Sequence, residues 1–174
     1  MFYFITTFLT ALLILVLLLY YTLKNGISPM PTSGKVREAL MQVLPEVEDG
    51  IIIDLGSGWG NLIFPLAKKY ESCHIFGYEN SPIPFWFSSL INSKKNLKIK
   101  RSNFFEIPLH NASIVVCYLY PKGMERLKAK LETELKPGTH VISHTFAVPE
   151  WKAKTTIEVD DLHHSKIYLY EVPT

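Results

Sequence analysis

The chain begins with a long apolar stretch. Residues Phe2 to Leu23 include no charged side chain, and the centre of the stretch is continuously apolar. About 20 such residues in a helix span a hydrocarbon core of roughly 30 Å. Tyr3 near one end and Tyr20 and Tyr21 near the other suit the two membrane interfaces. The pattern predicts a transmembrane anchor over residues 1–24.

A cleaved signal peptide is the alternative interpretation of this stretch. A signal peptide requires a basic start and a small-residue cleavage site, and the chain shows neither. Positive residues follow the span at Lys24, Lys35 and Arg37, and none precedes it. This asymmetry favours a single-pass membrane protein whose remaining residues lie on the cytoplasmic side.

The rest of the chain has the pattern of one α/β domain. Residues 25–34 are rich in turn formers and are predicted to be a linker, which leaves residues 35–174 for a single domain. Apolar runs of strand length then alternate with apolar residues at helical spacing. We expect helices over Lys35–Leu44, Asn61–Tyr70 and Pro82–Ser93, and strands over Ile51–Ile53, His74–Glu79, Leu97–Lys100, Ser113–Leu119 and Thr139–Phe146. Met124, Leu127, Leu131 and Leu135 mark one face of a further helix, which Pro137-Gly138 ends.

The carboxyl-terminal part departs from this alternation. Strands are expected over Thr155–Val159 and Lys166–Val172, and the segment between them is too short for a crossover helix, so the two should pair antiparallel. Strands that alternate with helices indicate a parallel sheet covered on both faces. The sequence therefore predicts a Rossmann-like α/β sheet of seven strands with an antiparallel last strand.

Composition excludes some functions. Lys and Arg total 18 against 16 Asp and Glu, a net charge of +2, so no nucleic-acid partner is expected. Cys73 and Cys117 have neither a metal-ligand spacing nor a disulfide framework. Cys117 lies in an apolar strand, where a buried side chain is the simpler interpretation and a nucleophile the alternative.

A glycine-rich turn follows the first predicted strand. Asp54 to Gly60 reads D-L-G-S-G-W-G, and glycines allow the backbone to turn tightly and to approach a ligand, while the next helix presents free N–H groups that can receive a carboxylate. The spacing does not fit a nicotinamide site, because Asn61 stands where the third glycine of G-x-G-x-x-G belongs. Glu79 closes the second strand about 20 residues further on, where a carboxylate can accept hydrogen bonds from ribose hydroxyls.

The turn resembles the first motif of class I S-adenosylmethionine-dependent methyltransferases. The resemblance implies S-adenosyl-L-methionine as cofactor, with Asp54 near its amino-acid end, Asn103 at the adenine amino group, and Phe104 or Phe105 against the adenine ring. It implies no metal. The expected cofactor-binding residues are Asp54, Gly56, Ser57, Gly58, Gly60, Glu79, Asn80, Asn103 and Phe104.

A closer resemblance is to a small membrane-anchored family that includes the lysine methyltransferases of the mitochondrial adenine nucleotide translocase and the ATP synthase c subunit. It is carried by the amino-terminal span, by Pro31-Thr32-Ser33, by the turn Tyr118-Leu119-Tyr120-Pro121, and by Val141 to Trp151 followed by two strands. The resemblance implies a protein lysine as acceptor, and the membrane span favours a membrane-associated protein as the substrate. Residues after the fourth strand face the methyl group in this architecture, so Tyr118, Tyr120 and Pro121 are the expected catalytic residues that line the acceptor channel.

Several interpretations remain open at this stage. His140 or His144 is either a base or an ordinary strand residue, and the stretch from Asp160 to His164 is either a metal site or a polar hairpin turn. The domain is short for this fold and leaves little sequence for a lid, which indicates an open site. Alternative functions are methylation of a lipid or small hydrophobic molecule, in a pocket lined by Phe85, Trp86 and Phe87, and noncatalytic cofactor binding.

Overall fold

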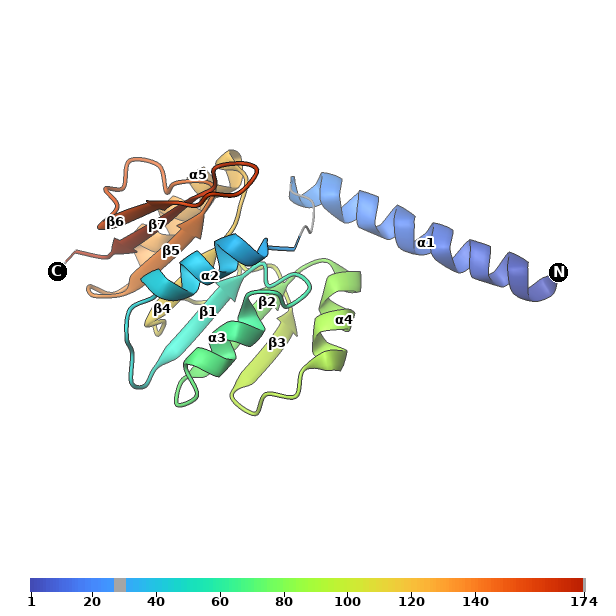
Figure 1. Cartoon of the computed structure of the whole chain (residues 1–174), viewed down its shortest axis with the longest axis horizontal. Helices are drawn as coiled ribbons and strands as arrows, with labels where there is room; N and C mark the ends of the chain where they lie inside the picture. The colour runs from blue at the N-terminus through green and yellow to red at the C-terminus, as the bar shows by residue number, and fades with distance from the viewer. Residues whose placement is uncertain (27–30, 174) are drawn as a thin grey trace.

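A computed structural model of the chain describes residues 1–26 and 31–173. The first helix, α1 (Phe2–Asn25), projects from the domain as a separate rod (Figure 1), and none of its residues is buried. It is long and apolar enough to cross a membrane. Most of the predicted linker, residues 27–30, lies outside the described residues.

The domain is built on one seven-stranded sheet with the order β3-β2-β1-β4-β5-β7-β6. The first five strands are parallel, and β7 pairs antiparallel with both β5 and β6. The predicted fold class and the predicted antiparallel end are thus confirmed. The strands are β1 (Ile51–Leu55), β2 (His74–Glu79), β3 (Leu97–Arg101), β4 (Ile114–Cys117), β5 (His140–His144), β6 (Thr155–Glu158) and β7 (Lys166–Glu171).

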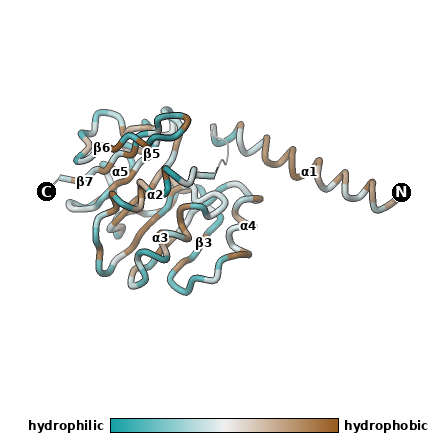
Figure 2. Tube along the Cα trace, in the orientation of Figure 1, coloured by the Kyte–Doolittle hydropathy of each residue, from teal (hydrophilic) through white to brown (hydrophobic). Residues whose placement is uncertain are grey.

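Helices cover both faces of the sheet, which explains why the central strands are apolar on both sides. On one face α2 (Gly34–Val43) and α3 (Ile63–Lys69) bury Leu40 and Leu66 against the sheet, and on the other α5 (Pro121–Glu134) buries Leu127. The helix α4 (Pro82–Ile91) packs beside β2 and β3 and also contacts α1. Figure 2 shows that the hydrophobic colouring concentrates in α1, in the central strands and in α4.

The sheet register brings the expected site residues to one edge. Leu55, the last residue of β1, is paired with Tyr78 of β2 and with Cys117 of β4. The residues that follow these three positions are Gly56, Glu79 and Tyr118. The carboxyl ends of parallel strands meet at the same edge, which is where ligands bind in open α/β sheets.

One predicted boundary near the site was wrong. The first strand was expected to end at Ile53, but β1 continues to Leu55, so Asp54 is a buried strand residue paired with both Gly77 and Val116. The helix expected from the apolar face of Met124, Leu127 and Leu131 is α5, which begins at Pro121 and buries these three residues. Proline suits the first helical position, where its missing N–H has no partner to lose.

Candidate active site

The glycine turn after β1 leaves open space beside its backbone. Gly56 and Gly58 have φ values of 92° and 52°, and a Cβ added to Gly56 would meet no atom within 4 Å. At Gly58 the nearest atom to such a Cβ is the Gly56 oxygen, at 3.9 Å. Gly60 differs, because a Cβ there would overlap the Phe64 ring. Gly56 and Gly58 therefore keep a space free for a ligand, whereas Gly60 permits packing.

Glu79 holds the turn in place. It is buried, and one carboxylate oxygen accepts a hydrogen bond from the Gly58 N–H at 2.8 Å while the other accepts from the Ser81 N–H at 2.6 Å. The same side chain thus connects the glycine turn to the start of α4. A carboxylate offers about four lone-pair positions, so Glu79 can still accept hydrogen bonds from a ligand.

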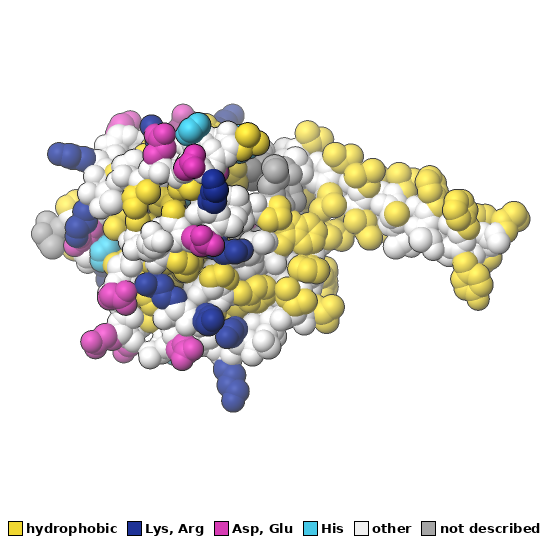
Figure 3. All heavy atoms as spheres, in the orientation of Figure 1, with side chains coloured by type: hydrophobic (Ala, Val, Ile, Leu, Met, Phe, Trp, Pro, Cys, Tyr) yellow, Lys and Arg dark blue, Asp and Glu magenta, His cyan; other side chains and the backbone are white. Residues whose placement is uncertain are grey.

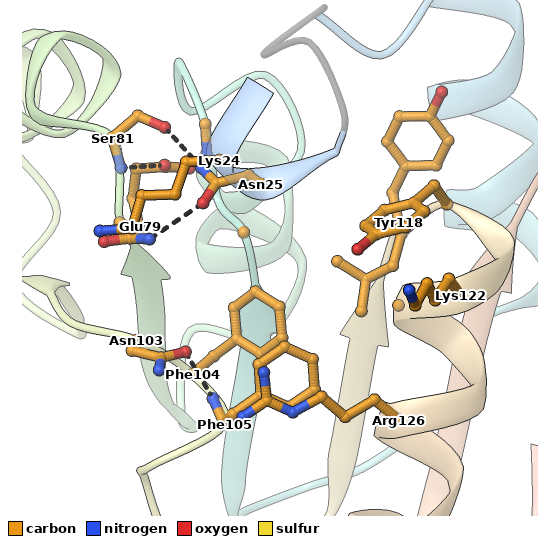
Figure 4. A pocket seen from close by; sticks show the side chains of 16 residues that line it. Lys24, Asn25, Glu79, Ser81, Asn103, Phe104, Phe105, Tyr118, Lys122 and Arg126 are labelled. Atoms are coloured by element: carbon orange, nitrogen blue, oxygen red, sulfur yellow. Dashed lines mark hydrogen bonds between the residues drawn. The ribbon is translucent and has the colours of Figure 1, made fainter. Parts of the chain in front are cut away.

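A cavity of about 390 Å³ opens beside the turn and Glu79. Figure 4 shows that side chains enter it from three directions: from α1, from the loop after β3, and from β4 and α5. Glu79 lies on one side of the cavity, and the aromatic rings lie on the other side together with Lys122 and Arg126. The cavity is lined by Lys24, Asn25, Gly56, Gly58, Glu79, Asn80, Ser81, Asn103, Phe104, Phe105, Tyr118, Leu119, Tyr120, Lys122, Gly123 and Arg126.

A smaller hollow of about 40 Å³ adjoins this cavity and shares Gly56, Gly58 and Tyr118 with it. Its lining residues include Asp54 and Ser57. The Ser57 hydroxyl is buried and has no hydrogen-bond partner within the described residues, and it lies against Gly77, where an added Cβ would come within 2.9 Å of it, so it points into the fold and not towards the hollow. The two connected spaces fit an elongated ligand that is polar at one end and carries a flat apolar group at the other.

The electrostatics of the smaller hollow depend on Asp54. Burial raises the pKa of this carboxyl to about 7, and the negative charge of Glu79 adds to the rise. A cationic group bound beside Asp54 would favour its ionised form. The expected reception of a carboxylate by free N–H groups is not supported at the turn, because α3 begins only at Ile63 and the Gly56, Ser57, Gly58 and Gly60 N–H groups donate within the protein.

The residues after β4 separate into two groups. Tyr118 lines both spaces, and Tyr120 lines the larger one and precedes α5 as its N-cap. Pro121 is exposed at the first position of α5 and lines neither space. The Tyr118 ring stacks on His144 at a centroid distance of 4.2 Å, and burial lowers the pKa of His144 to about 4. His144 is thus a neutral side chain that fixes the orientation of Tyr118.

Asn103 and its aromatic neighbours form the far wall. The Asn103 amide donates to Glu106 at 2.6 Å, and its oxygen accepts from the Phe105 N–H at 3.2 Å. The rings of Phe104 and Phe105 lie 4.6 Å apart, and the Arg126 guanidinium lies 3.9 Å from the centre of the Phe105 ring. This wall offers a flat apolar surface with polar groups at its rim.

Two pairs of cavity residues were missed by the sequence reasoning. Lys24 and Asn25 had been assigned to the anchor and the linker, yet the Asn25 side chain accepts a hydrogen bond from Asn80 at 3.0 Å and donates one to Ser81 at 3.2 Å. No local pattern predicts this contact, which joins residues far apart in the chain. The other pair, Lys122 and Arg126, are four residues apart on α5 and thus lie on one helix face.

Other expected positions lie elsewhere. Phe85, Trp86 and Phe87 line neither of these two spaces. His140 is at the opposite end of β5 and lies 3.8 Å from Glu171. Asp161 accepts hydrogen bonds from the Ser165 N–H and hydroxyl inside the hairpin turn. Burial raises the pKa of Cys117 to about 12, so this residue is no ready nucleophile.

The fold and the site define the class of the protein. The chain superposes with a TM-score of 0.71 on the crystal structure of an RNA methyltransferase from Salinibacter ruber in complex with S-adenosyl-L-homocysteine. The match has 26% sequence identity and covers 83% of this chain and 94% of the other. Together with the glycine turn and its free space, this confirms the resemblance: the chain is an S-adenosylmethionine-dependent methyltransferase.

The family follows from the sequence comparisons. The ANTKMT methyltransferase domain matches residues 54–155, and the chain belongs to this family. It is 35% identical over 150 residues to a protein-lysine N-methyltransferase of Saccharolobus islandicus (strain REY15A), across 82% of this chain and 92% of that protein. It is also 30% identical over 126 residues to the Mus musculus lysine N-methyltransferase of the ATP synthase c subunit, across 70% of this chain. The aligned region covers 50% of the mouse protein.

Proposed function

We propose that the chain is a protein-lysine N-methyltransferase that acts on a membrane-associated protein. The position of α1 carries this proposal: its last residues, Lys24 and Asn25, line the same cavity as the glycine turn. If α1 spans a bilayer, the cavity lies at the membrane surface, within reach of a side chain that emerges from a neighbouring membrane protein. The tether then raises the effective concentration of such neighbours. The relatives named above support lysine as the acceptor.

The same proposal includes the arrangement of the chain. Residues 1–24 form a transmembrane anchor, residues 25–34 the connection, and residues 35–174 the methyltransferase domain. The apolar surface of α1 and the absence of buried residues in it support the anchor. The positive residues that follow the span favour a domain on the cytoplasmic side.

Within the site, we assign the cofactor's amino-acid end to the smaller hollow, beside Asp54 and the turn at Ser57. Glu79 would accept the ribose hydroxyls, and Asn103 with Phe104 would hold the adenine. The backbones of Gly56 and Gly58 lie between these ends, where the two spaces meet. The shape and the polarity of the two spaces support this orientation.

The acceptor side is assigned to Tyr118 and Tyr120. The bound cofactor would supply an electrophilic methyl group for an in-line displacement by a neutral amine. Burial raises the pKa of Tyr118, so its hydroxyl stays protonated and can accept a hydrogen bond from the amine and orient it.

The lysine ammonium must lose a proton before transfer, and contact with the apolar wall at Phe104 and Leu119 would lower the pKa of the ammonium. The proton leaves to solvent, since Lys24 and Lys122 mark an exposed rim.

The assignment of Asp54 predicts a pH dependence of cofactor binding. Because the pKa of this carboxyl is raised to about 7, binding of S-adenosylhomocysteine, whose ammonium group favours the ionised form, should release a proton. The affinity should rise on the order of tenfold between about pH 5.5 and about pH 7. Titration calorimetry in two buffers of different ionisation enthalpy measures both effects. His144 does not titrate in this range, since its pKa is about 4.

Asp54→Asn supplies the control for this titration. The variant should bind more weakly and without the pH slope, because the amide cannot ionise. A slope that persists in Asp54→Asn would assign the proton to another group. The folding stability of the unliganded protein should have the opposite pH dependence. The Asp54 carboxyl, with its raised pKa, binds more protons in the folded state than in the unfolded state. Its contribution to stability is therefore lost as the pH rises towards 7.

The function is tested with the full chain reconstituted in lipid vesicles. These are mixed with membranes from cells that lack the gene and with methyl-labelled S-adenosylmethionine. We expect label in a membrane protein, released on hydrolysis as methyl-lysine, and no transfer by the Gly58→Val variant described below. Label confined to lipid, to small molecules or to RNA would overturn the proposed acceptor while leaving the methyltransferase class intact.

A further inference from the structure

The outward face of α4 is apolar in a way that is unusual for a helix on a domain surface. Pro82–Ile91 carries no charged residue, and its inner face buries Pro84 and Ser88. On the outer side, Trp86 is 64% exposed, Phe87 47%, Leu90 86% and Ile91 49%. These four positions recur at i, i+1, i+4 and i+5, which places them on one helix face. A surface helix normally turns charged or polar residues to this side.

This face lies next to the end of α1. Figure 1 shows α4 beside the carboxyl-terminal end of α1 and roughly transverse to it. The two helices are in contact. Asn25 bonds to Ser81, the residue that precedes α4, and Arg101 donates to the Tyr21 hydroxyl at 3.2 Å. Figure 3 shows hydrophobic side chains at α4 and α1 gathered into adjoining patches on this side of the molecule. The outer face of α4 is therefore held near the end of the apolar span.

The residues after α4 are basic. Lys94, Lys95, Lys98, Lys100 and Arg101 are all exposed, and no acidic residue occurs between Glu79 and Glu106. These five positive charges exceed the net charge of +2 of the whole chain, so the remainder is net negative. An apolar helix face followed by a basic cluster is typical of helices that lie in a membrane interface with anionic lipids. At ten residues α4 is too short to span a bilayer, so it would lie in the interfacial plane.

We infer that the outer face of α4, formed by Trp86, Phe87, Leu90 and Ile91, is a second membrane contact that lies in the lipid interface beside α1. The inference rests on the proposed anchor, because α1 fixes how far α4 is from the bilayer. With two contacts the domain cannot rotate freely about α1, and the cavity beside Lys24 and Asn25 keeps one orientation relative to the membrane. The basic cluster from Lys94 to Arg101 would meet the lipid headgroups.

The test uses the full chain in vesicles of phosphatidylcholine and phosphatidylglycerol. Cys73 and Cys117 are buried, so a polarity-sensitive thiol label attaches to an introduced cysteine. The reporter is Leu90→Cys, the matched control is Leu162→Cys, which is 89% exposed in the β6–β7 turn, and Leu15→Cys reports on the anchor. We expect spin-labelled lipid with a shallow nitroxide to quench the Leu90→Cys label about threefold more than the Leu162→Cys label, as for a helix seated in the interface.

The outcomes separate this inference from the anchor. If iodide in the aqueous phase quenches the Leu90→Cys label as strongly as the Leu162→Cys label, while the Leu15→Cys label stays in lipid, the anchor stands and the second contact is overturned. Exposure of both the Leu15→Cys and the Leu90→Cys labels would overturn both. Protection of the Leu90→Cys label only after a membrane protein is added would assign the face to a protein partner and also overturn the inference.

The basic cluster provides a second measurement. In the Lys94→Gln, Lys95→Gln double variant, lipid quenching of the Leu90→Cys label should fall in vesicles with phosphatidylglycerol and stay unchanged in pure phosphatidylcholine. An equal fall of lipid quenching in both kinds of vesicle would contradict the proposed contact between the basic cluster and anionic headgroups. Unchanged binding of S-adenosylhomocysteine in every labelled variant shows that the fold is intact, since none of these positions lines the cavity.

Discussion

Gly58→Val is expected to abolish cofactor binding while the domain remains folded. At Gly58 a Cβ would meet no protein atom closer than the Gly56 oxygen at 3.9 Å, so the valine side chain would project into the cavity rather than into the core. The φ of 52° lies in the left-handed region, which costs a side chain about 1–3 kcal/mol, less than the stability of a typical domain. Titration calorimetry with S-adenosylhomocysteine should show a loss of affinity of at least about 100-fold.

Gly138→Val is the matched control for this variant. Gly138 also has a positive φ, 83°, and a Cβ there meets nothing within 4 Å, but it lies in the turn before β5 and lines neither space. This variant carries comparable backbone strain and should bind normally. If Gly58→Val binds as well as Gly138→Val, the site is misassigned. Gly60→Val should instead lower the melting temperature of the domain, because its Cβ would overlap the Phe64 ring and its φ of 94° disfavours a side chain.

Glu79→Gln should weaken both the cofactor site and the fold. The two oxygens of Glu79 accept from the Gly58 and Ser81 N–H groups, and the amide nitrogen of glutamine cannot accept. One buried N–H group is left without a partner, which costs about 1–3 kcal/mol of stability. Loss of the charged acceptor for the ribose hydroxyls should reduce the affinity for S-adenosylhomocysteine about 10- to 100-fold.

Glu158→Gln provides the comparison, because Glu158 also closes a strand but is exposed on β6 at the far edge of the sheet. Its melting temperature and its affinity should both match those of the unaltered chain. A Glu79→Gln variant that melts lower but binds normally would show that Glu79 only supports the turn and does not contact the cofactor.

The fold was predictable because its determinants are local and periodic. The apolar runs that became β2 and β7, and the helical spacing that became α5, are visible over a few residues at a time. The antiparallel pairing of β6 and β7 followed from the short connection between them. The boundary that failed, at the end of β1, depends on neighbouring strands: Asp54 is a strand residue because β2 and β4 pair with β1 on both sides.

The candidate site was predictable only in part. The positions of Gly56, Gly58 and Glu79 follow from one motif and one strand end, and the register of the parallel sheet brings them together. The place of Asn25 in the cavity wall could not be predicted, because its hydrogen bonds with Asn80 and Ser81 join residues that are 55 and 56 positions apart in the chain. The alternative in which the aromatic residues of α4 line a pocket stayed open, since a sequence does not show which face of a short apolar helix the sheet will cover.

By itself, then, the sequence determined the class of fold, the glycine turn, the acid at the end of β2 and the apolar span, because each is a pattern within a short segment. The tertiary structure decided what those patterns face. It placed the end of α1 at the cavity beside the glycine turn, raised the pKa of Asp54 by burying it near Glu79, and exposed Trp86 and Leu90. These properties depend on packing between distant segments, which local patterns do not record.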